Sequence, residues 1–166
     1  MKNQPCSNCG AMASVVRSNY HFTEMGLPVE LMRINVVKCS ECGNEDPIIP
    51  NLDDLMHTLA LMVICDPCKL SGPEVRFLRK YSGKSAEEFS RLLHVDHTHL
   101  SKVENGRTEI GRRLDKLVRF VVLTMSSELN DKADQLIELL PTISDECEDP
   151  HREIQIDPST LQHSYA

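Results

Sequence analysis

The chain has 166 residues, a formal net charge of -7 at pH 7, 40% hydrophobic residues and no Trp. This length fits one domain or two small ones, and it is too short for enzymes built on large cofactor-binding domains. No apolar run approaches the roughly 20 residues that span a bilayer, and the first residues, MKNQPC, lack the apolar region of a secretory signal. We therefore expect a soluble, cytoplasmic bacterial protein with no membrane partner.

Charge is distributed unevenly along the chain. Residues 69–125 carry 12 Lys and Arg against 7 Asp and Glu, whereas residues 1–68 carry 4 against 8 and residues 126–166 carry 2 against 10. A basic middle between acidic ends favours contact of the middle with nucleic acid.

Six of the seven cysteines form C-x-x-C pairs, which in a reducing compartment indicates metal-bound thiolates more than a disulfide framework. Cys6 with Cys9 and Cys39 with Cys42 bracket 29 residues. Two such pairs supply the four ligands of a tetrahedral zinc ion and leave no open position for a reacting water. We predict one structural Zn²⁺ per chain and no catalysis at it.

The third pair, Cys65 and Cys68, leaves two interpretations open. Two thiolates alone do not complete a zinc site, although His57 or a second protomer could add ligands. Otherwise the pair consists of two thiols in a turn between domains, and we do not expect a second zinc ion there. Cys147 has no partner pattern and is expected to be a free thiol.

The elements predicted in chain order define an α+β fold. Residues 14–22 and 29–38 are rich in β-branched and aromatic residues and predict strands of an antiparallel meander. Residues 52–64 have helical apolar spacing, and further helices are expected near 73–83, 85–93, 97–105, 111–125 and 131–140. The predicted organisation is a zinc-binding β domain at 1–50, a linking helix and turn at 51–69, an all-α DNA-binding domain at 70–141 and an acidic, mostly disordered tail at 142–166.

Residues 85–106 carry the main functional pattern. Ser85 and Glu88 match a capping box that opens a helix burying Phe89, Leu92 and Leu93, and Asp96 can cap a second helix that Gly106 ends. This layout is typical of a helix-turn-helix, whose second helix enters the major groove of DNA. The residues expected to meet bases and phosphates are His97, Thr98, Ser101 and Lys102, flanked by Lys84, Asn105 and Arg107.

Further positive charge is expected near this surface from Arg112, Arg113 and Arg119. Hydrophobic Val118, Val121 and Val122 are candidates for a dimer interface, with burial in the core as the alternative. There is no Gly-rich phosphate loop, no nucleophile elbow and no distinctive carboxylate pair, so the sequence gives no indication of an enzyme.

Four segments together resemble the MqsA-type antitoxins, which combine a YgiT-type zinc finger with an Xre-type helix-turn-helix. They are C-S-N-C-G, K-C-S-E-C-G, L-S-G-P-E-V-R-F-L-R-K and L-S-K-V-E-N-G, within about residues 4–125. The resemblance implies that Cys6, Cys9, Cys39 and Cys42 bind zinc and that Thr98 and Lys102 read bases. It also implies a homodimer on an inverted repeat and a toxin bound by the N-terminal domain.

The chain departs from that family at several positions. Its best-described member has Asn and Arg where this chain has Thr98 and Lys102, so a different operator is expected. The Xre pattern has Gln where this chain has Ala86, and a small residue or Gly at Ser90 and His94. The turn at His94 is therefore expected to be strained.

The leading hypothesis is a zinc-stabilised, homodimeric repressor of transcription that binds double-stranded DNA as the antitoxin of a toxin-antitoxin pair, with a small basic toxin as partner. A regulator of the same construction without a toxin would show the same residues. The alternatives from other classes are a zinc-ribbon adaptor for protein interactions and a redox or metal sensor that uses Cys65 and Cys68.

Overall fold

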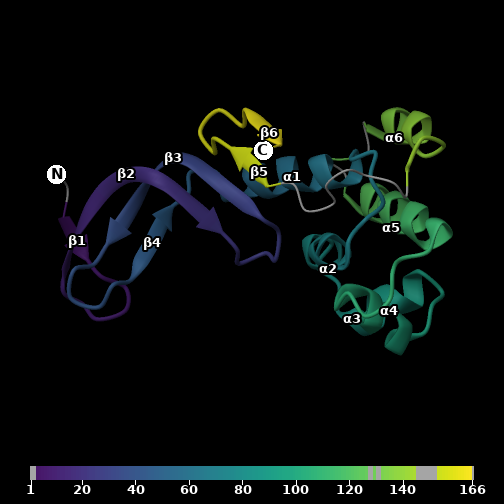
Figure 1. Ribbon diagram of the computed structural model, residues 1–166, viewed down its shortest axis with the longest axis horizontal. Helices are drawn as coiled ribbons and strands as arrows, with labels where there is room; N and C mark the ends of the chain where they lie inside the picture. Colours follow the sequence, from purple (N-terminus) through teal and green to yellow (C-terminus); the bar gives the residue numbers. More distant parts are fainter. Residues whose placement is uncertain (1–2, 127–128, 130–131, 145–152, 166) are drawn as a thin grey trace. The chain divides into compact units, whose positions relative to one another are not determined.

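The computed structural model describes residues 3–126, 129, 132–144 and 153–165. In these residues the chain has a mixed α+β fold with one sheet and six helices (Figure 1). It divides into two compact units, one formed by Met1–Thr23, Pro28–Leu55 and Arg152–Ala166 and the other by Glu24–Leu27 and Met56–His151. Among the described helices, none has both the length and the apolar character that crossing a bilayer requires.

The first unit contains the antiparallel meander predicted from the sequence. Strands β1 (Asn3–Pro5), β2 (Met12–Phe22), β3 (Val29–Lys38) and β4 (Glu45–Ile48) pair in succession, all antiparallel. The register of β2 against β3 shifts between Ser18 and Tyr20, and Arg33 adopts a left-handed backbone conformation opposite this shift, with φ of 53°. The shift marks a bulge that separates the two halves of β3.

The C-terminal residues correct the prediction of a disordered tail. Strands β5 (Ile154–Ile156) and β6 (His163–Tyr165) form an antiparallel hairpin, and β5 pairs in parallel with Val29–Leu31 of β3. Figure 1 shows this hairpin, in yellow, beside β3. Ile154 and Ile156 are buried, so two aliphatic residues in period-two alternation were enough to build a strand inside an acidic segment.

The six helices follow the predicted order closely. They are α1 (Leu52–Ile64), α2 (Gly72–Tyr81), α3 (Ala86–Leu92), α4 (His97–Glu104), α5 (Arg112–Met125) and α6 (Ala133–Leu139). The capping box at Ser85 and Glu88 and the cap at Asp96 are formed as predicted, and a further capping box joins Ser71 to Glu74. Side-chain caps therefore fix the start of three consecutive helices.

The core of the second unit is formed by fully buried apolar residues from several helices, including Phe77, Phe89, Leu100 and Leu123. Leu92, which was expected in this core, has 45% of its surface exposed. It is the last residue of the short helix α3 and faces away from the helices that cover Phe89 and Leu93.

Arg119 corrects a second expectation. Its side chain is completely buried and donates hydrogen bonds to the backbone carbonyls of Ile64, Asp66 and Cys68, at 2.8, 2.6 and 2.5 Å. It also forms an ion pair with buried Asp115 at 3.2 Å. Arg119 thus holds the end of α1 and the following turn and adds no charge to the surface. It lies on the inner face of α5, because it shares the helical spacing of buried Asp115 and Val122.

Candidate metal centre and candidate nucleic-acid interface

The four cysteines of the first two C-x-x-C pairs come together in the first unit. Their sulfur atoms all lie within 4.8 Å of one another. Cys6 Sγ is 3.6 Å from Cys42 Sγ, and Cys9 Sγ is 3.6 Å from Cys39 Sγ. A tetrahedral zinc ion with Zn–S bonds of about 2.3 Å holds its sulfurs about 3.8 Å apart. The spacing is therefore consistent with one zinc ion.

Both pairs are held by the same backbone geometry. The Cys6 amide donates to the Ala11 carbonyl at 2.8 Å, and the Cys39 amide donates to the Asn44 carbonyl at 3.0 Å. Gly10 and Gly43 each donate to the first cysteine of their pair at 3.0 Å and adopt φ of 75° and 71°, a conformation that favours glycine. Each turn thus directs two sulfurs toward the same point.

The thiols of this cluster differ in their pKa values. The Asn44 amide, followed by the Asn8 side chain, lowers the pKa of Cys42 to about 6. The Ala11 amide lowers the pKa of Cys9, but hydrogen bonds with Cys42 and Cys39 outweigh it and raise that pKa to about 12. Four thiolates so close together repel one another, so a cation is required for all four to be ionised at neutral pH.

The apolar core beside the cluster is small. Cys6, Ala13, Val37 and Cys39 form it, with Ala11 and Val15 packed against them. A core of this size supplies little hydrophobic stabilisation, so a bound metal would contribute directly to the folding free energy of this part of the sheet.

The third pair does not present two matching thiols. Cys65 has a free, half-buried thiol, and burial raises its pKa, whereas Cys68 is disulfide-bonded. The cluster of Cys6, Cys9, Cys39 and Cys42 is the only group of three or more potential ligands found among the described residues. Cys147 lies outside them.

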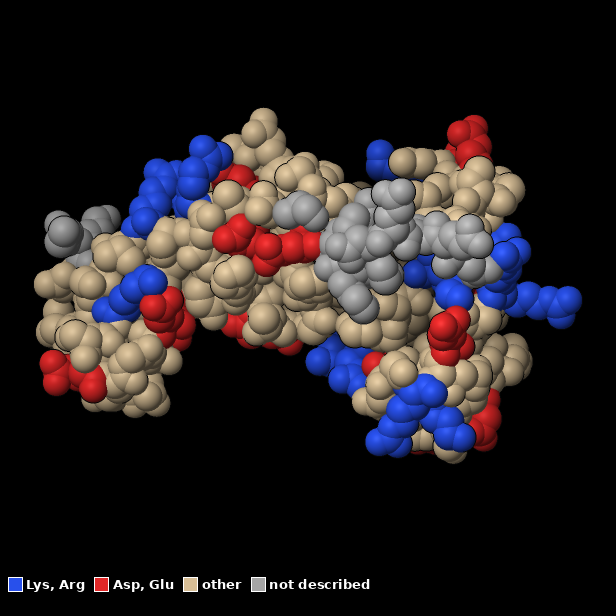
Figure 2. Space-filling view, viewed as in Figure 1, with Lys and Arg blue, Asp and Glu red and all other residues tan. Residues whose placement is uncertain are grey.

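In the second unit, α4 has one buried and one exposed side. Leu100 and Val103 are buried as predicted, while His97, Thr98 and Lys102 are exposed and Ser101 is half-buried. Of the flanking residues expected to contact phosphates, Asn105 and Arg107 are exposed and Lys84 is half-buried. Figure 2 shows Lys and Arg side chains over α3, α4 and α5, with some acidic side chains among them.

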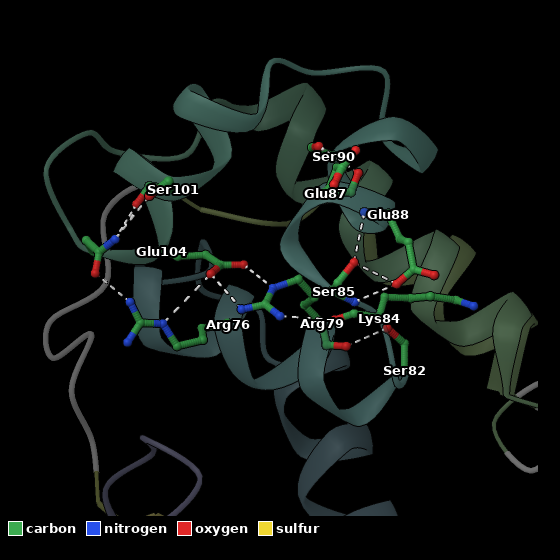
Figure 3. Close-up of polar contacts among 11 residues, drawn as sticks. Arg76, Arg79, Ser82, Lys84, Ser85, Glu87, Glu88, Ser90, Ser101 and Glu104 are labelled. Carbon is green, nitrogen blue, oxygen red and sulfur yellow. Dashed lines mark hydrogen bonds and ion pairs between the residues drawn. The ribbon is translucent and has the colours of Figure 1, made fainter.

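A partly buried ion pair holds α4 against α2. Arg79 Nε and Nη2 donate to the two carboxylate oxygens of Glu104 at 2.6 and 2.9 Å, and Arg79 Nη1 donates to the Lys84 carbonyl at 3.0 Å. Figure 3 shows Arg79 between Glu104 and the turn that leads into α3. A single guanidinium thus joins α2, α4 and the start of α3, and a bidentate pair of this kind is geometrically specific.

Glycine at position 72 permits the close approach of α2 to the end of α4. A Cβ atom at Gly72 would lie 2.3 Å from the Val103 carbonyl oxygen and 3.1 Å from the Glu104 carbonyl oxygen. Both are backbone atoms and cannot rotate away. This packing role of Gly72 was not predicted, because only the folded chain brings the Val103 carbonyl beside it.

The side chain of Asn105 is exposed but is held by two hydrogen bonds. Its Nδ2 donates to the Ser101 carbonyl at 2.6 Å, and its Oδ1 accepts from Arg76 Nη2 at 2.5 Å. Asn105 therefore orients the Arg76 side chain at the C-terminal end of α4. Asn105 is itself exposed at this end of the helix. Arg76 was not among the predicted site residues, because only the folded structure brings it to this end of α4.

The turn between α3 and α4 has the strain expected at His94. This residue has φ of 51°, in the left-handed region that glycine adopts at lower cost. Asp96 then caps α4 by accepting from the amides of Thr98 and His99 at 2.8 and 3.2 Å. Hydrogen bonds from Thr98, then from His99, lower the pKa of Asp96.

The predicted dimer residues on α5 are mostly in the core. Val118 and Val122 are completely buried and Val121 is half-buried. Exposed apolar side chains instead lie at Leu117, Phe120 and Met125 of α5 and at Ile137 of α6. The burial of Val118 and Val122 agrees with the alternative that the sequence left open, in which these residues belong to the core, because sequence alone does not distinguish the inner from the outer side of α5.

Comparisons of the chain with family models, with curated proteins and with solved structures found no significant match.

Proposed function

We propose that this protein is a homodimeric, sequence-specific DNA-binding regulator of transcription whose N-terminal unit is stabilised by zinc. The observation that carries the proposal is the arrangement of α3 and α4, in which His97, Thr98 and Lys102 are exposed on a helix whose opposite side is buried. In the proposed mode of binding, α4 enters the major groove and α3 crosses the phosphate backbone, as in a helix-turn-helix.

The local contacts support this role for α4. The Arg79–Glu104 pair and the close approach at Gly72 hold the helix in one orientation without using its exposed side. A fixed helix loses little conformational entropy when it binds, which favours specific recognition. Lys102 would donate to a base or phosphate as a point charge, Thr98 would contact a base edge, and Arg107 would contact phosphate.

Dimerisation would use the exposed apolar side of α5 with Ile137 of α6. Phe120 and Ile137 expose 46% and 56% of their surface, so their burial against a second copy would stabilise association. A twofold axis through this surface would place two copies of α4 on two half-sites of an inverted repeat.

We further propose that the protein is an antitoxin, and the support for this role is the acidic charge of the first unit. The first unit is rich in acidic residues, including Glu30, Glu41 and Glu45, and such a surface complements a small basic toxin. Co-purification of a basic protein encoded beside this chain would support that role, whereas its absence would leave a regulator that acts alone.

The main test is selection of binding sites from a random pool of duplex DNA by the zinc-loaded protein. We expect enrichment of an inverted repeat and an affinity that falls steeply as salt rises. Lys102→Ala should weaken binding to the selected site by about 1–3 kcal/mol, whereas Lys38→Ala in the first unit should leave it unchanged.

Two results would contradict the proposal. One is a pool that shows no enrichment. The other is a selected site whose affinity is insensitive to Lys102→Ala. An adaptor for proteins, the alternative function, predicts weak binding to duplex DNA that does not depend on salt.

A further inference from the structure

One edge of β3 is shared by two different strands. Residues Val29–Leu31 pair with β5, and residues Asn35–Lys38 pair with β4. The strand β4 follows β3 directly in sequence, whereas β5 returns from the far end of the chain after the whole helical unit. The Val29–Leu31 edge is therefore completed by a segment that arrives from a distance.

The residues that receive this segment are arranged by β2 and β3 alone. The Arg33 amide donates to Asn19 Oδ1 at 3.1 Å, and its carbonyl accepts from Arg17 Nε at 2.9 Å. These contacts hold Arg33 in its left-handed conformation, with φ of 53°. Strained backbone of this kind persists where the surrounding structure fixes it, and it often marks a binding function.

The C-terminal segment meets this edge with aliphatic side chains and with charge. Ile154 and Ile156 lie opposite Val29 and Leu31 in the ladder and are buried with them. Arg33 Nη2 donates to Asp157 Oδ2 at 2.9 Å at one end of the strand.

At the other end of the strand, Glu153 Oε1 lies 3.2 Å from His21 Nδ1. Between the two ends, Gln155 Nε2 donates to Glu30 Oε2 at 3.1 Å. The contacting residues of the segment thus follow the pattern acidic, Ile, Gln, Ile, Asp.

An open pocket, lined mostly by polar side chains, lies beside these residues. A cavity of about 240 Å³ lies between β3 and the hairpin, lined by Met32 and Arg33 from β3 and by five hairpin residues, all polar, that include Gln155, Asp157 and His163. The hairpin is therefore attached by a ladder of three residue pairs, by buried Ile154 and Ile156 and by polar contacts at both ends of the strand.

We propose that the Val29–Leu31 edge of β3 is a docking site for an extended strand of a partner protein with the pattern acidic, aliphatic, Gln, aliphatic, Asp. The chain's own residues 153–157 occupy this site in cis. Strand addition to a sheet edge is a common mode of peptide recognition, in which backbone hydrogen bonds give affinity and alternate side chains give specificity.

Cis occupancy makes the site selective. A tethered segment competes at an effective concentration in the millimolar range, so a free strand of equal intrinsic affinity binds poorly until the tethered one is released. The hairpin thus suppresses weak partners and protects an edge that would otherwise be open to aggregation. This inference does not depend on DNA binding.

The test uses a fluorescein-labelled peptide with the sequence of residues 153–165 and measures its binding to the full-length, zinc-loaded chain by anisotropy. Ile156→Lys places a charge at a completely buried position and should release the hairpin. We expect this variant to bind the peptide roughly 100-fold more tightly than the unmodified chain. Ile48→Lys, at an exposed position of β4, is the matched control and should behave as the unmodified chain does.

Charge reversal then tests the recognition itself. In the Ile156→Lys chain, Arg33→Asp should abolish binding of the original peptide and restore binding of a peptide that carries Asp157→Arg. If Ile156→Lys retains zinc and helical circular dichroism but does not bind the peptide, the docking site is refuted. The docking site is also refuted if Arg33→Asp changes the affinity for neither the original peptide nor the peptide that carries Asp157→Arg.

A second variant covers the case in which Ile156→Lys loses its zinc. A protease site inserted between residues 148 and 149, and cleaved before exchange is measured, leaves the sequence of the hairpin unchanged. Exchange of the cut hairpin for labelled peptide supports the docking site. No exchange in a tenfold excess of peptide overturns it and makes the hairpin a permanent part of the sheet.

Discussion

Arg119→Met should destabilise the helical unit more than any substitution of a surface arginine. The buried guanidinium donates to the carbonyls of Ile64, Asp66 and Cys68 and to Asp115. Methionine has a similar length but cannot donate, so the substitution leaves three carbonyls without this donor and Asp115 without its cation. Breaking a buried ion pair by removing one partner costs about 3–5 kcal/mol, and the lost carbonyl contacts place the expected loss in the upper part of that range.

Urea denaturation followed by circular dichroism at 222 nm measures the loss of stability. Arg113→Met, at an exposed position of the same helix, is the control and should change the free energy of unfolding by less than about 0.5 kcal/mol. Adding Asp115→Asn to Arg119→Met should recover about 1–2 kcal/mol, because it removes the unpaired buried charge. A loss below about 1 kcal/mol for Arg119→Met, or no recovery in the double variant, would refute the role assigned to this arginine.

Four further outcomes are expected. Gly72→Ala should lower the stability of the helical unit by about 1–3 kcal/mol, measured by urea denaturation, because the new methyl group collides with the Val103 carbonyl. His94→Gly should raise stability by up to about 1 kcal/mol in the same assay, since glycine removes the left-handed strain. Because hydrogen bonds lower the pKa of Asp96, its ionised form stabilises α4 above the ordinary pKa of 3.8 and loses this effect as the pH falls below it. Asp96→Asn, an equally good cap, should therefore reduce the fall in urea midpoint between pH 5 and pH 3. Cys39→Ser should reduce the zinc content of the purified chain to well below one ion, measured by atomic emission, while helical circular dichroism is retained.

Local sequence signals were enough to place the helices and the meander. The bounds of α1 match the predicted helix at 52–64, and the caps at Ser85 and Asp96 form because each signal involves residues within four positions of one another. The four zinc-ligand candidates were found for a similar reason, since each C-x-x-C turn is local and two turns complete one tetrahedral set.

The features that were missed depend on contacts between distant residues. Pairing of β5 with β3 joins residues about 125 positions apart, and three alternating residues in an acidic segment give almost no signal of their own. The burial of Arg119 follows from carbonyls more than 50 positions away. The inner and outer sides of α5 are both apolar, so the position of its exposed side required the structure.

Completion of the N-terminal sheet by β5 has a consequence for synthesis on the ribosome. The chain leaves the first unit at Leu55 and returns to it at Arg152. At 5–20 residues per second, the intervening stretch of about 100 residues takes roughly 5–20 s to translate. During that interval the nascent first unit has the four cysteines of its cluster but lacks the strand that pairs with Val29–Leu31. The unit is then most open to capture by a chaperone or by a neighbouring nascent chain.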